Sequence, residues 1–444
     1  MNINMPDEAR TIIEVLNNAG YEAYIVGGCV RDCILGRTPS DWDITTSAKP
    51  EEVKELFRRT VDTGIQHGTV TVLIKSNAYE VTTFRIDGEY TDHRRPEGVT
   101  YTSELSEDLR RRDFTINAMA YSDKTGLVDL YGGVEDLENG IVRCVGVADE
   151  RFDEDALRIM RAVRFAAQLG FEIDDATKSA AAGHAKELKL ISAERVETEL
   201  TKLLTSDHPE RIIDMYELGI TAVILPEFDL MMETEQNTPY HLYDVGRHTI
   251  EVLKNVGPTK VMRYAALLHD AGKPYLKTTD KNGRDHFKGH AVKSKEIAVS
   301  VLKRLRMDNA TIRDVKTIVY WHDFGIGGPV SKKAVRRMLS KMGPEYYDSL
   351  IEIKYADMKG QSDYRIKERT EALEDIQRYH DEIIAEGDAL AIKDLKINGK
   401  VLQEIGVKPG PQMGLILNSL LEKVLEKPEL NTREELEKLA REYK

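Results

Sequence analysis

The stretch Ile25-Val-Gly-Gly-Cys-Val-Arg-Asp-Cys-Ile-Leu-Gly-Arg37, followed by Asp41-Trp-Asp43, decides the fold of the N-terminal part of the chain. The apolar run Tyr21–Val26 predicts a buried strand that ends at Gly27-Gly28. Two glycines after a strand let backbone N–H groups approach a phosphate closely, and the N-terminus of a following helix favours negative charge. We therefore predict that Gly28 and Arg31 contribute to a phosphate-binding site.

Two carboxylates follow this turn. Asp41 and Asp43 lie two residues apart, so on a predicted strand Asp41–Thr45 both side chains project from the same face. Hard oxygen ligands beside a phosphate site suit Mg²⁺, and Glu80 on a later strand could supply a third ligand. Such a pair is often only a solvated strand end, but its combination with the glycine turn favours a catalytic Mg²⁺ site held by Asp41 and Asp43.

The remaining patterns predict an α+β head followed by an all-helical remainder. A helix is expected over Asp7–Asn18, and the β-branched runs Gly68–Lys75 and Tyr79–Arg85 predict further strands. From about Asp153 onward the period is that of helices, interrupted by short joints that contain Pro or Gly.

Composition limits the class of protein. The chain has 444 residues, enough for about three domains. It contains no apolar run of membrane-spanning length, and its N-terminus lacks the pattern of a secretory signal. Three cysteines without a Cys-x-x-Cys pair favour a reducing cytoplasm. The net charge of −13 means that any nucleic acid must be bound by local basic patches.

Three consecutive arginines lie in Leu109-Arg-Arg-Arg-Asp-Phe-Thr-Ile-Asn-Ala-Met-Ala-Tyr121, and arginine forks suit phosphates and ribose hydroxyls. Together with the glycine turn and the two aspartates, this segment resembles the signature of class II tRNA nucleotidyltransferases (CCA-adding enzymes) and their poly(A) polymerase relatives, within the polymerase-β-like superfamily. The resemblance implies that Arg111, Arg112 and Asp113 contact the ribose and triphosphate of the incoming nucleotide. The segment Thr83–Pro96 resembles the flexible loop of the family and has its full length, unlike the loop of CC-adding members.

A third motif lies on a helix predicted over Phe152–Phe165. By pattern alone this is an amphipathic helix with ion pairs along one side. By resemblance, Glu154-Asp155-x-x-Arg158 is the motif that reads the incoming base, and Arg161 and Arg164 line the nucleotide and phosphate side of the pocket. A carboxylate accepts from the amino group of cytosine or adenine while a guanidinium donates to the ring nitrogen; uracil and guanine would present a carbonyl oxygen to the carboxylate. Glu194 and Arg195 are interpreted as structural.

Histidines and aspartates mark a second site. His248, the pair His269-Asp270 and Asp357 match the HD phosphohydrolase superfamily, which implies that these four residues bind a divalent transition metal. His290 and His322 could extend the site to a second metal or bind phosphate. The alternative for a histidine on an apolar helix face is a packed core residue without a ligand role. His241 and His286 are interpreted as ordinary polar residues. Gly272 is expected to end the helix that carries the pair.

The C-terminal segment Asp394–Gly414 resembles the region of bacterial CCA-adding enzymes that grips the tRNA elbow, although Lys400 stands where many relatives have Asp. By pattern alone, the Pro-Gly-Pro within it favours a rigid turn before a helix. The segment Ser331–Arg337 carries a basic helix face that is either a phosphate contact or a solvated surface.

The sequence therefore predicts a cytoplasmic, Mg²⁺-dependent enzyme that adds CCA to the 3′ end of tRNA from CTP and ATP and releases pyrophosphate, with a possible metal-dependent phosphohydrolase activity. The alternatives are an A-adding enzyme or poly(A) polymerase and, in another class, an HD phosphohydrolase with an RNA-binding head. The expected partners are the tRNA 3′ end and elbow, with no membrane and no inferable protein partner. The expected domains are a nucleotidyltransferase head (1–150), a neck that reads the base (151–225), an HD domain (226–366) and a tRNA-binding tail (367–444).

Overall fold

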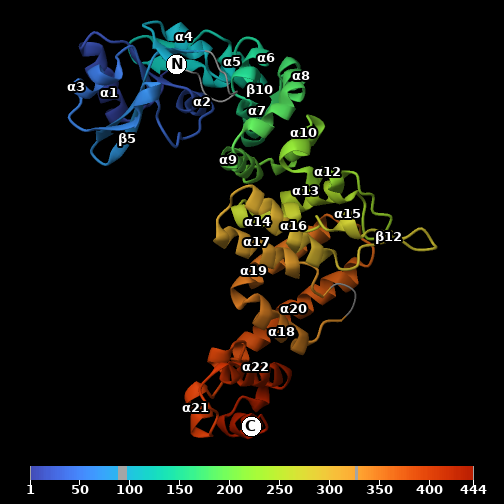
Figure 1. Cartoon of the computed structure of the whole chain (residues 1–444). Helices are drawn as coiled ribbons and strands as arrows, with labels where there is room; N and C mark the ends of the chain where they lie inside the picture. Colours follow the sequence, from blue (N-terminus) through green and yellow to red (C-terminus); the bar gives the residue numbers. More distant parts are fainter. Residues whose placement is uncertain (1, 89–97, 326–328, 444) are drawn as a thin grey trace. The chain divides into compact units, whose positions relative to one another are not determined.

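The computed structural model describes residues 2–88, 98–325 and 329–443 (Figure 1). It divides into an N-terminal unit, residues 1–229 with 304–307, and a C-terminal unit, residues 230–303 with 308–444. This division lies close to the predicted boundary between neck and HD domain; the finer boundaries stay predictions. The predicted flexible loop lies largely outside the described residues.

A seven-stranded mixed sheet organises the N-terminal unit, in the order β3-β4-β5-β2-β1-β8-β9. Only β2 and β5 pair in parallel within it. Two short pairs, β6–β7 and β10–β11, lie outside it. The strands are β1 (Ala23–Val26), β2 (Ile44–Thr46), β3 (Thr60–Gly64), β4 (Thr69–Ile74), β5 (Asn77–Thr83), β6 (Arg85–Asp87), β7 (Val99–Tyr101), β8 (Met119–Ser122), β9 (Gly126–Asp129), β10 (Ile141–Val142) and β11 (Glu172–Ile173).

Helices flank this sheet and then replace it along the chain (Figure 1). The first, α1, coincides with the predicted helix, and its buried Ile12 and Leu16 face the core. The helices are α1 (Asp7–Asn18), α2 (Gly28–Ile34), α3 (Pro50–Leu56), α4 (Leu105–Arg110), α5 (Gly133–Asn139), α6 (Ala148–Glu154), α7 (Leu157–Leu169), α8 (Asp175–His184), α9 (Ala193–Leu204), α10 (Ile212–Glu217), α11 (Thr221–Ile224) and α12 (Pro226–Met232). The expected α+β head with a helical continuation is confirmed.

The C-terminal unit is helical apart from one two-stranded ribbon, β12 (Thr278–Thr279) with β13 (Asp285–His286). Helix α13 packs against α14 and α19, and α14 packs against α17. Among the described residues, no helix is both long and apolar enough to cross a membrane. The helices are α13 (Val245–Asn255), α14 (Lys260–Leu268), α15 (Lys273–Leu276), α16 (His290–Arg304), α17 (Asn309–Trp321), α18 (Lys332–Met342), α19 (Tyr347–Lys359), α20 (Ile366–Glu386), α21 (Gly399–Glu404), α22 (Pro411–Glu426) and α23 (Arg433–Arg441).

Candidate active site and metal centre

The two candidate catalytic aspartates lie just before β2 rather than on it. The strand begins at Ile44, so the prediction of a strand that includes Asp41 and Asp43 was wrong. The backbone of Asp43 still contacts the end of β1, because its carbonyl accepts a hydrogen bond of 3.0 Å from Val26 N–H. The loop before β2 therefore places both carboxylates at the end of the central strands.

Glu80 is brought to the same place by strand register. In the parallel pair β2–β5, Ile44 lies opposite Val81, so the residues that precede them, Asp43 and Glu80, are neighbours. Burial and the nearby charge of Asp41 raise the pKa of Asp43 to about 6; Arg112 opposes this shift and Glu80 adds to it. A buried carboxylate crowded by two others is the expected state of a cation site before the cation binds. The donor set therefore fits Mg²⁺.

The glycine turn is shaped around an arginine. Gly27 has a φ of +82°, and a Cβ at this position would lie 2.8 Å from Arg112 Nη1. Any side chain there would both strain the backbone and displace the guanidinium. The predicted phosphate cradle at Gly28 therefore lies next to Arg31, which follows it on α2, and next to Arg112.

Asp108 holds the arginine motif in place. This fully buried carboxylate pairs with Arg111 at 2.7 Å and with Arg112 at 3.7 Å, and it accepts a hydrogen bond from Thr45. Burial alone would raise the pKa of Asp108, but the two guanidinium groups outweigh burial and lower it. No role was predicted for Asp108, although its spacing of three and four residues from the arginines is the signal for such a pair.

A hydrogen-bonded chain connects the arginines of the head with those of the neck. Arg31 donates to Asn117 at 2.7 Å, Asn117 donates to Asp113 at 3.1 Å, and Arg161 donates to the other oxygen of Asp113 at 2.8 Å. Burial would raise the pKa of Asp113, but Arg161 outweighs burial and lowers it. Asp113 thus orients Arg161 and Asn117 within the protein, and its direct contact with the nucleotide, implied by resemblance, stays a prediction.

The ring of Phe165 lies close to three of the arginine side chains. The guanidinium carbons of Arg31, Arg161 and Arg164 lie 5.1, 5.3 and 3.8 Å from the centre of its ring. The six predicted nucleotide-binding arginines all lie in the N-terminal unit, and among them Arg112 acts on Asp43: Arg31, Arg111, Arg112, Arg158, Arg161 and Arg164. Such a density of guanidinium groups suits a triphosphate.

The predicted neck helix is broken at its functional centre. Helix α6 ends at Glu154, Asp155 has the extended conformation (φ −144°, ψ 101°), and α7 begins at Leu157. The single helix predicted over Phe152–Phe165 was therefore wrong. The Asp155 carboxylate accepts one hydrogen bond from Leu157 N–H at 3.0 Å and one from Arg195 at 2.7 Å. Arg195, predicted to be structural, thus orients the carboxylate predicted to read the base.

Glu154 and Arg158 lie on opposite sides of this break. They form an ion pair, and Arg158 also donates to the carbonyl oxygens of Arg151 and Arg111, each at 3.0 Å. Arg158 is only 9% exposed. It therefore connects the neck to the arginine motif of the head.

Replacing Glu199 with Ala should destabilise the N-terminal unit strongly. Glu199 pairs with Arg164 at 2.6 Å, and both side chains are buried. Removing one partner leaves a buried guanidinium uncompensated, at a cost of about 3–5 kcal/mol in the free energy of unfolding. Urea unfolding followed by Trp42 fluorescence in a Trp321→Phe background reports on this unit. The control Asp62→Ala removes the exposed pair with Lys54 and should cost about 1 kcal/mol or less; equal losses would contradict the prediction.

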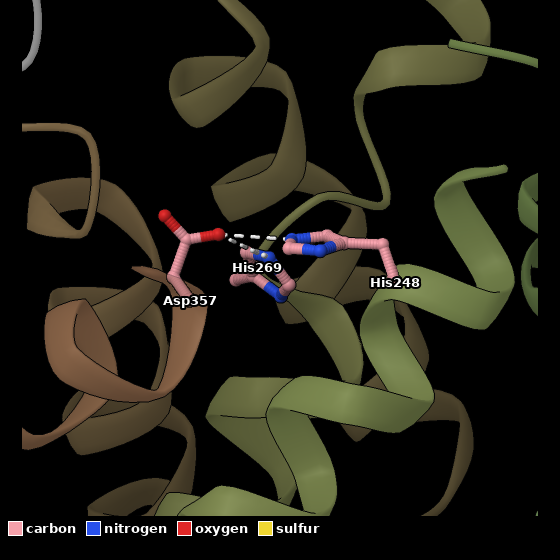
Figure 2. A group of neighbouring side chains, drawn as sticks. All are labelled: His248, His269 and Asp357. Carbon is pink, nitrogen blue, oxygen red and sulfur yellow. Dashed lines mark hydrogen bonds and ion pairs between the residues drawn. The ribbon is translucent and has the colours of Figure 1, made fainter. Parts of the chain in front are cut away.

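The histidine and aspartate motifs of the C-terminal unit come together at one site. His248 on α13, His269 after α14 and Asp357 on α19 point their polar ends toward one another (Figure 2). The Asp357 carboxylate lies 2.9 Å from His248 Nε2 and 3.9 Å from His269 Nε2. Asp270 completes this set, with one oxygen 3.2 Å from His269 Nε2 and 3.7 Å from His248 Nε2.

A second triad shares Asp270. The other oxygen of Asp270 lies 3.4 Å from His290 Nε2 and 3.7 Å from His322 Nε2. The two Nε2 atoms are 3.2 Å apart. The predicted extension of the site by His290 and His322 therefore agrees with the geometry, and Asp270 lies between two groups of ligand atoms.

The hydrogen bonds around the histidines prepare their Nε2 atoms as ligands. In each ring Nδ1 lies within hydrogen-bond distance of a backbone carbonyl, which only accepts, so Nδ1 donates to the carbonyl and Nε2 is the nitrogen directed at the other candidate ligands. His269 Nε2 and Asp270 Oδ1 are buried and have no hydrogen-bond partner among the described residues. The carbonyls belong to Gly360 for His248, Ala266 for His269, Phe287 for His290 and Val319 for His322. Imidazoles with buried carboxylates fit a divalent transition metal.

The surroundings of this site correct two predictions. Gly272 has a φ of −82° and does not end a helix in the left-handed conformation; a Cβ there would lie 2.5 Å from the carbonyl oxygen of His290, so glycine is needed for close packing. His241, predicted to be an ordinary polar residue, also lies close to the site. It lies 3.4 Å from Lys273, whose ammonium is 2.6 Å from Asp270. Burial and Lys273 lower the pKa of His241 to about 2, which keeps it neutral.

Comparison with known proteins places these sites in a family. Residues 23–143 match the model described as the poly A polymerase head domain. Residues 170–232 match the model "Probable RNA and SrmB- binding site of polymerase A", and residues 290–440 match tRNA nucleotidyltransferase domain 2. The head match covers the carboxylates and the arginine motif.

Several similar proteins are named CCA-adding enzymes. The CCA-adding enzyme of Lactiplantibacillus plantarum is 58% identical over 201 residues, which cover 45% of this chain and 49% of that protein, so this match spans about half the length of the relative. The CCA-adding enzyme of Levilactobacillus brevis is 36% identical over 424 residues, 94% of both proteins. A crystal structure of the Bacillus stearothermophilus CCA-adding enzyme in complex with CTP has 30% identity and a TM-score of 0.71, covering 98% of this chain and 96% of that one. Because the similarity extends over nearly the whole of both proteins, the chain belongs to the family of CCA-adding enzymes, tRNA nucleotidyltransferases with a poly(A) polymerase head.

Proposed function

We propose that this chain adds C, C and A to the 3′ end of tRNA from CTP and ATP, releases pyrophosphate, and performs this reaction with Asp41 and Asp43. The observation that carries the proposal is the crowding of Asp41 and Asp43, just before the start of β2, with Glu80 of the neighbouring strand β5, while Arg112 is close enough to act on Asp43. The relatives are CCA-adding enzymes, and one was crystallised with CTP.

The residues divide the work between the reacting atoms and the nucleotide. Asp41 and Asp43 would hold Mg²⁺, which activates the attacking hydroxyl and offsets charge on the leaving pyrophosphate. Arg31 and Arg112 lie beside the glycine turn and bind the triphosphate there. Asp155 accepts a hydrogen bond from the amino group of cytosine or adenine, while Arg158 donates to the adjacent ring nitrogen.

The experiment uses three tRNA substrates with labelled CTP and ATP: one that lacks all three terminal nucleotides, one that lacks the last two, and one that lacks only the terminal A. A CCA-adding enzyme extends all three to the mature end. Extension of only the third would identify an A-adding enzyme, and unlimited addition of A would identify a poly(A) polymerase. A cytoplasmic location agrees with a tRNA substrate and with three free cysteines.

A second activity is supported by the ligand set in the C-terminal unit. We propose that His248, His269, Asp270 and Asp357 hold a transition metal that catalyses hydrolysis of a phosphate ester, with His290 and His322 available to a second ion. The buried Nε2 of His269 and Oδ1 of Asp270, which lack hydrogen-bond partners among the described residues, support this proposal. Gln361 orients the Asp357 carboxylate by donating to both of its oxygens at 3.0 Å. The tail is proposed to grip the tRNA elbow.

Replacing His248 with Ala should lower the affinity for Mn²⁺ or Ni²⁺ at least tenfold, because one imidazole ligand is lost. Metal content after dialysis measures the affinity, and release of product from a 2′,3′-cyclic nucleotide measures hydrolysis. The control His286→Ala removes an exposed histidine outside the site and should change neither. Stoichiometric metal without turnover would leave a structural metal site; wild-type protein that binds no metal would contradict both roles.

A further inference from the structure

A pocket of about 320 Å³ opens in the C-terminal unit at the junction of α17 and α18. Its apolar wall is formed chiefly by Trp321 and Phe324, and one of its edges by Lys333, Arg337 and Lys341. None of these residues belongs to the metal centre or to the nucleotide site. The combination of aromatic rings with several cations indicates a specific class of ligand.

The cations form one face of α18. Lys333, Arg337 and Lys341 follow one another at intervals of four residues, so they lie in a row that is about 12 Å long. Glu426 and Glu422 of α22 pair with the first two, but these pairs are exposed and contribute little stability. Their replacement by phosphate groups is therefore inexpensive in free energy, and the row presents positive charge on a chain whose net charge is −13.

The aromatic wall is partly accessible. The rings of Trp321 and Phe324 are in edge-to-face contact, with centroids 6.0 Å apart, and both side chains are only partly buried. Unstacked bases bind to such rings in proteins that recognise single-stranded nucleic acid, while neighbouring lysines and arginines contact the backbone phosphates. A volume of about 320 Å³ is at the small end of ligand pockets and suits one base rather than a duplex.

We propose that this pocket binds one unstacked nucleotide of the tRNA substrate, with the base against Trp321 and Phe324 and the flanking phosphates along Lys333, Arg337 and Lys341. This contact is separate from the 3′ end that is extended, and it rests on the proposed tRNA substrate. A row of cations longer than one nucleotide favours a polynucleotide over a free nucleotide. The pocket thus supplies an anchor for tRNA that is independent of its reacting end.

Kinetics test the aromatic wall. Replacing Trp321 with Ala removes the stacking surface and should raise KM for tRNA about tenfold, while kcat and KM for CTP stay unchanged. Trp321→Phe keeps an aromatic face and should restore most of the affinity for tRNA, which separates loss of stacking from loss of folding. Unchanged KM for tRNA in Trp321→Ala, with wild-type protein active, overturns the inference; an inactive wild-type protein would instead contradict the proposed function.

Salt dependence tests the cations. Lys341 is exposed, so Lys341→Glu leaves the fold intact, and it should weaken tRNA binding and reduce the slope of log affinity against log salt by about one. The matched control Lys303→Glu makes the same charge change at an exposed position of the C-terminal unit outside the pocket. Equal effects of the two substitutions would show only a general charge effect and would overturn the site.

Fluorescence tests the stacking directly. The chain has two tryptophans, so Trp42→Phe leaves Trp321 as the only one. Binding of tRNA should quench its emission, and Phe324→Ala should weaken that quenching. Quenching by CTP or ATP alone to the same extent would identify a mononucleotide site, and the absence of quenching at saturating tRNA would exclude stacking; either result contradicts the proposal.

Discussion

We expect Asp43→Asn to eliminate nucleotide incorporation and to leave tRNA binding intact. The substitution keeps the shape of the side chain but replaces a charged oxygen ligand by a neutral amide, which weakens Mg²⁺ binding. The loss of several kcal/mol of transition-state stabilisation corresponds to a decrease in kcat of about 10³-fold or more. Single-turnover incorporation of labelled CTP measures this decrease, and gel-shift titration measures tRNA affinity.

The same variant should lose activity without losing thermal stability. Because burial and neighbouring carboxylates raise the pKa of Asp43 to about 6, its ionised form destabilises the metal-free protein at neutral pH. Asp43→Asn should therefore unfold at the same temperature as wild type or a higher one in EDTA. Asp41→Ala should be equally inactive. Retained incorporation in either variant would contradict the catalytic assignment, and a lowered unfolding temperature would contradict the electrostatic explanation.

Much of the head could be predicted because its signals are local. The helix Asp7–Asn18 has an apolar stripe, and the buried strand before Gly27 ends at residues that only a turn accommodates. The strand was predicted to begin at Asp41 instead of Ile44, because the alternation of polar and apolar residues does not show where strand pairing begins. Sheet pairing places Ile44 opposite Val81, and this non-local contact has no signature in the sequence around Asp41.

The break in the neck shows a different limit. Residues 152–165 have a continuous helical period, and nothing in that period indicates that Asp155 is extended. The break is stabilised by a partner 40 residues away, since Arg195 binds the Asp155 carboxylate. Local propensity was overridden by a tertiary contact, at the position to which the resemblance assigns base recognition.

The residues of the candidate metal centre could be predicted from the sequence, but their arrangement in space could not. His269 and Asp270 are adjacent in sequence, yet the other ligands come from four further segments of the chain. Lys273 could have been found from its position three residues after Asp270, whereas the proximity of His241 to Lys273 is a contact over 32 residues that no spacing rule encodes.

Asp155→Asn should reduce the discrimination of this enzyme between CTP and UTP by about 100-fold. A carboxylate only accepts hydrogen bonds, so it binds the amino group of cytosine and repels the carbonyl oxygen of uracil. An amide donates as well as accepts and tolerates both bases. Discrimination against UTP is large when the wrong base leaves a buried polar group unpaired. Removing this discrimination should increase kcat/KM for UTP and decrease kcat/KM for CTP and ATP.

Two further substitutions separate recognition from packing. Arg195→Ala frees the Asp155 carboxylate without changing its chemistry, so it should lower kcat/KM for CTP and ATP while UTP stays rejected. Asp153→Asn makes the same change at an exposed carboxylate two residues away and should have no effect on base choice. If Asp155→Asn leaves the ratio of CTP to UTP incorporation unchanged, base selection does not depend on this carboxylate. Among the described residues, the Asp155 carboxylate accepts one hydrogen bond on each oxygen, from Leu157 N–H and from Arg195, so each oxygen retains an electron pair for the base.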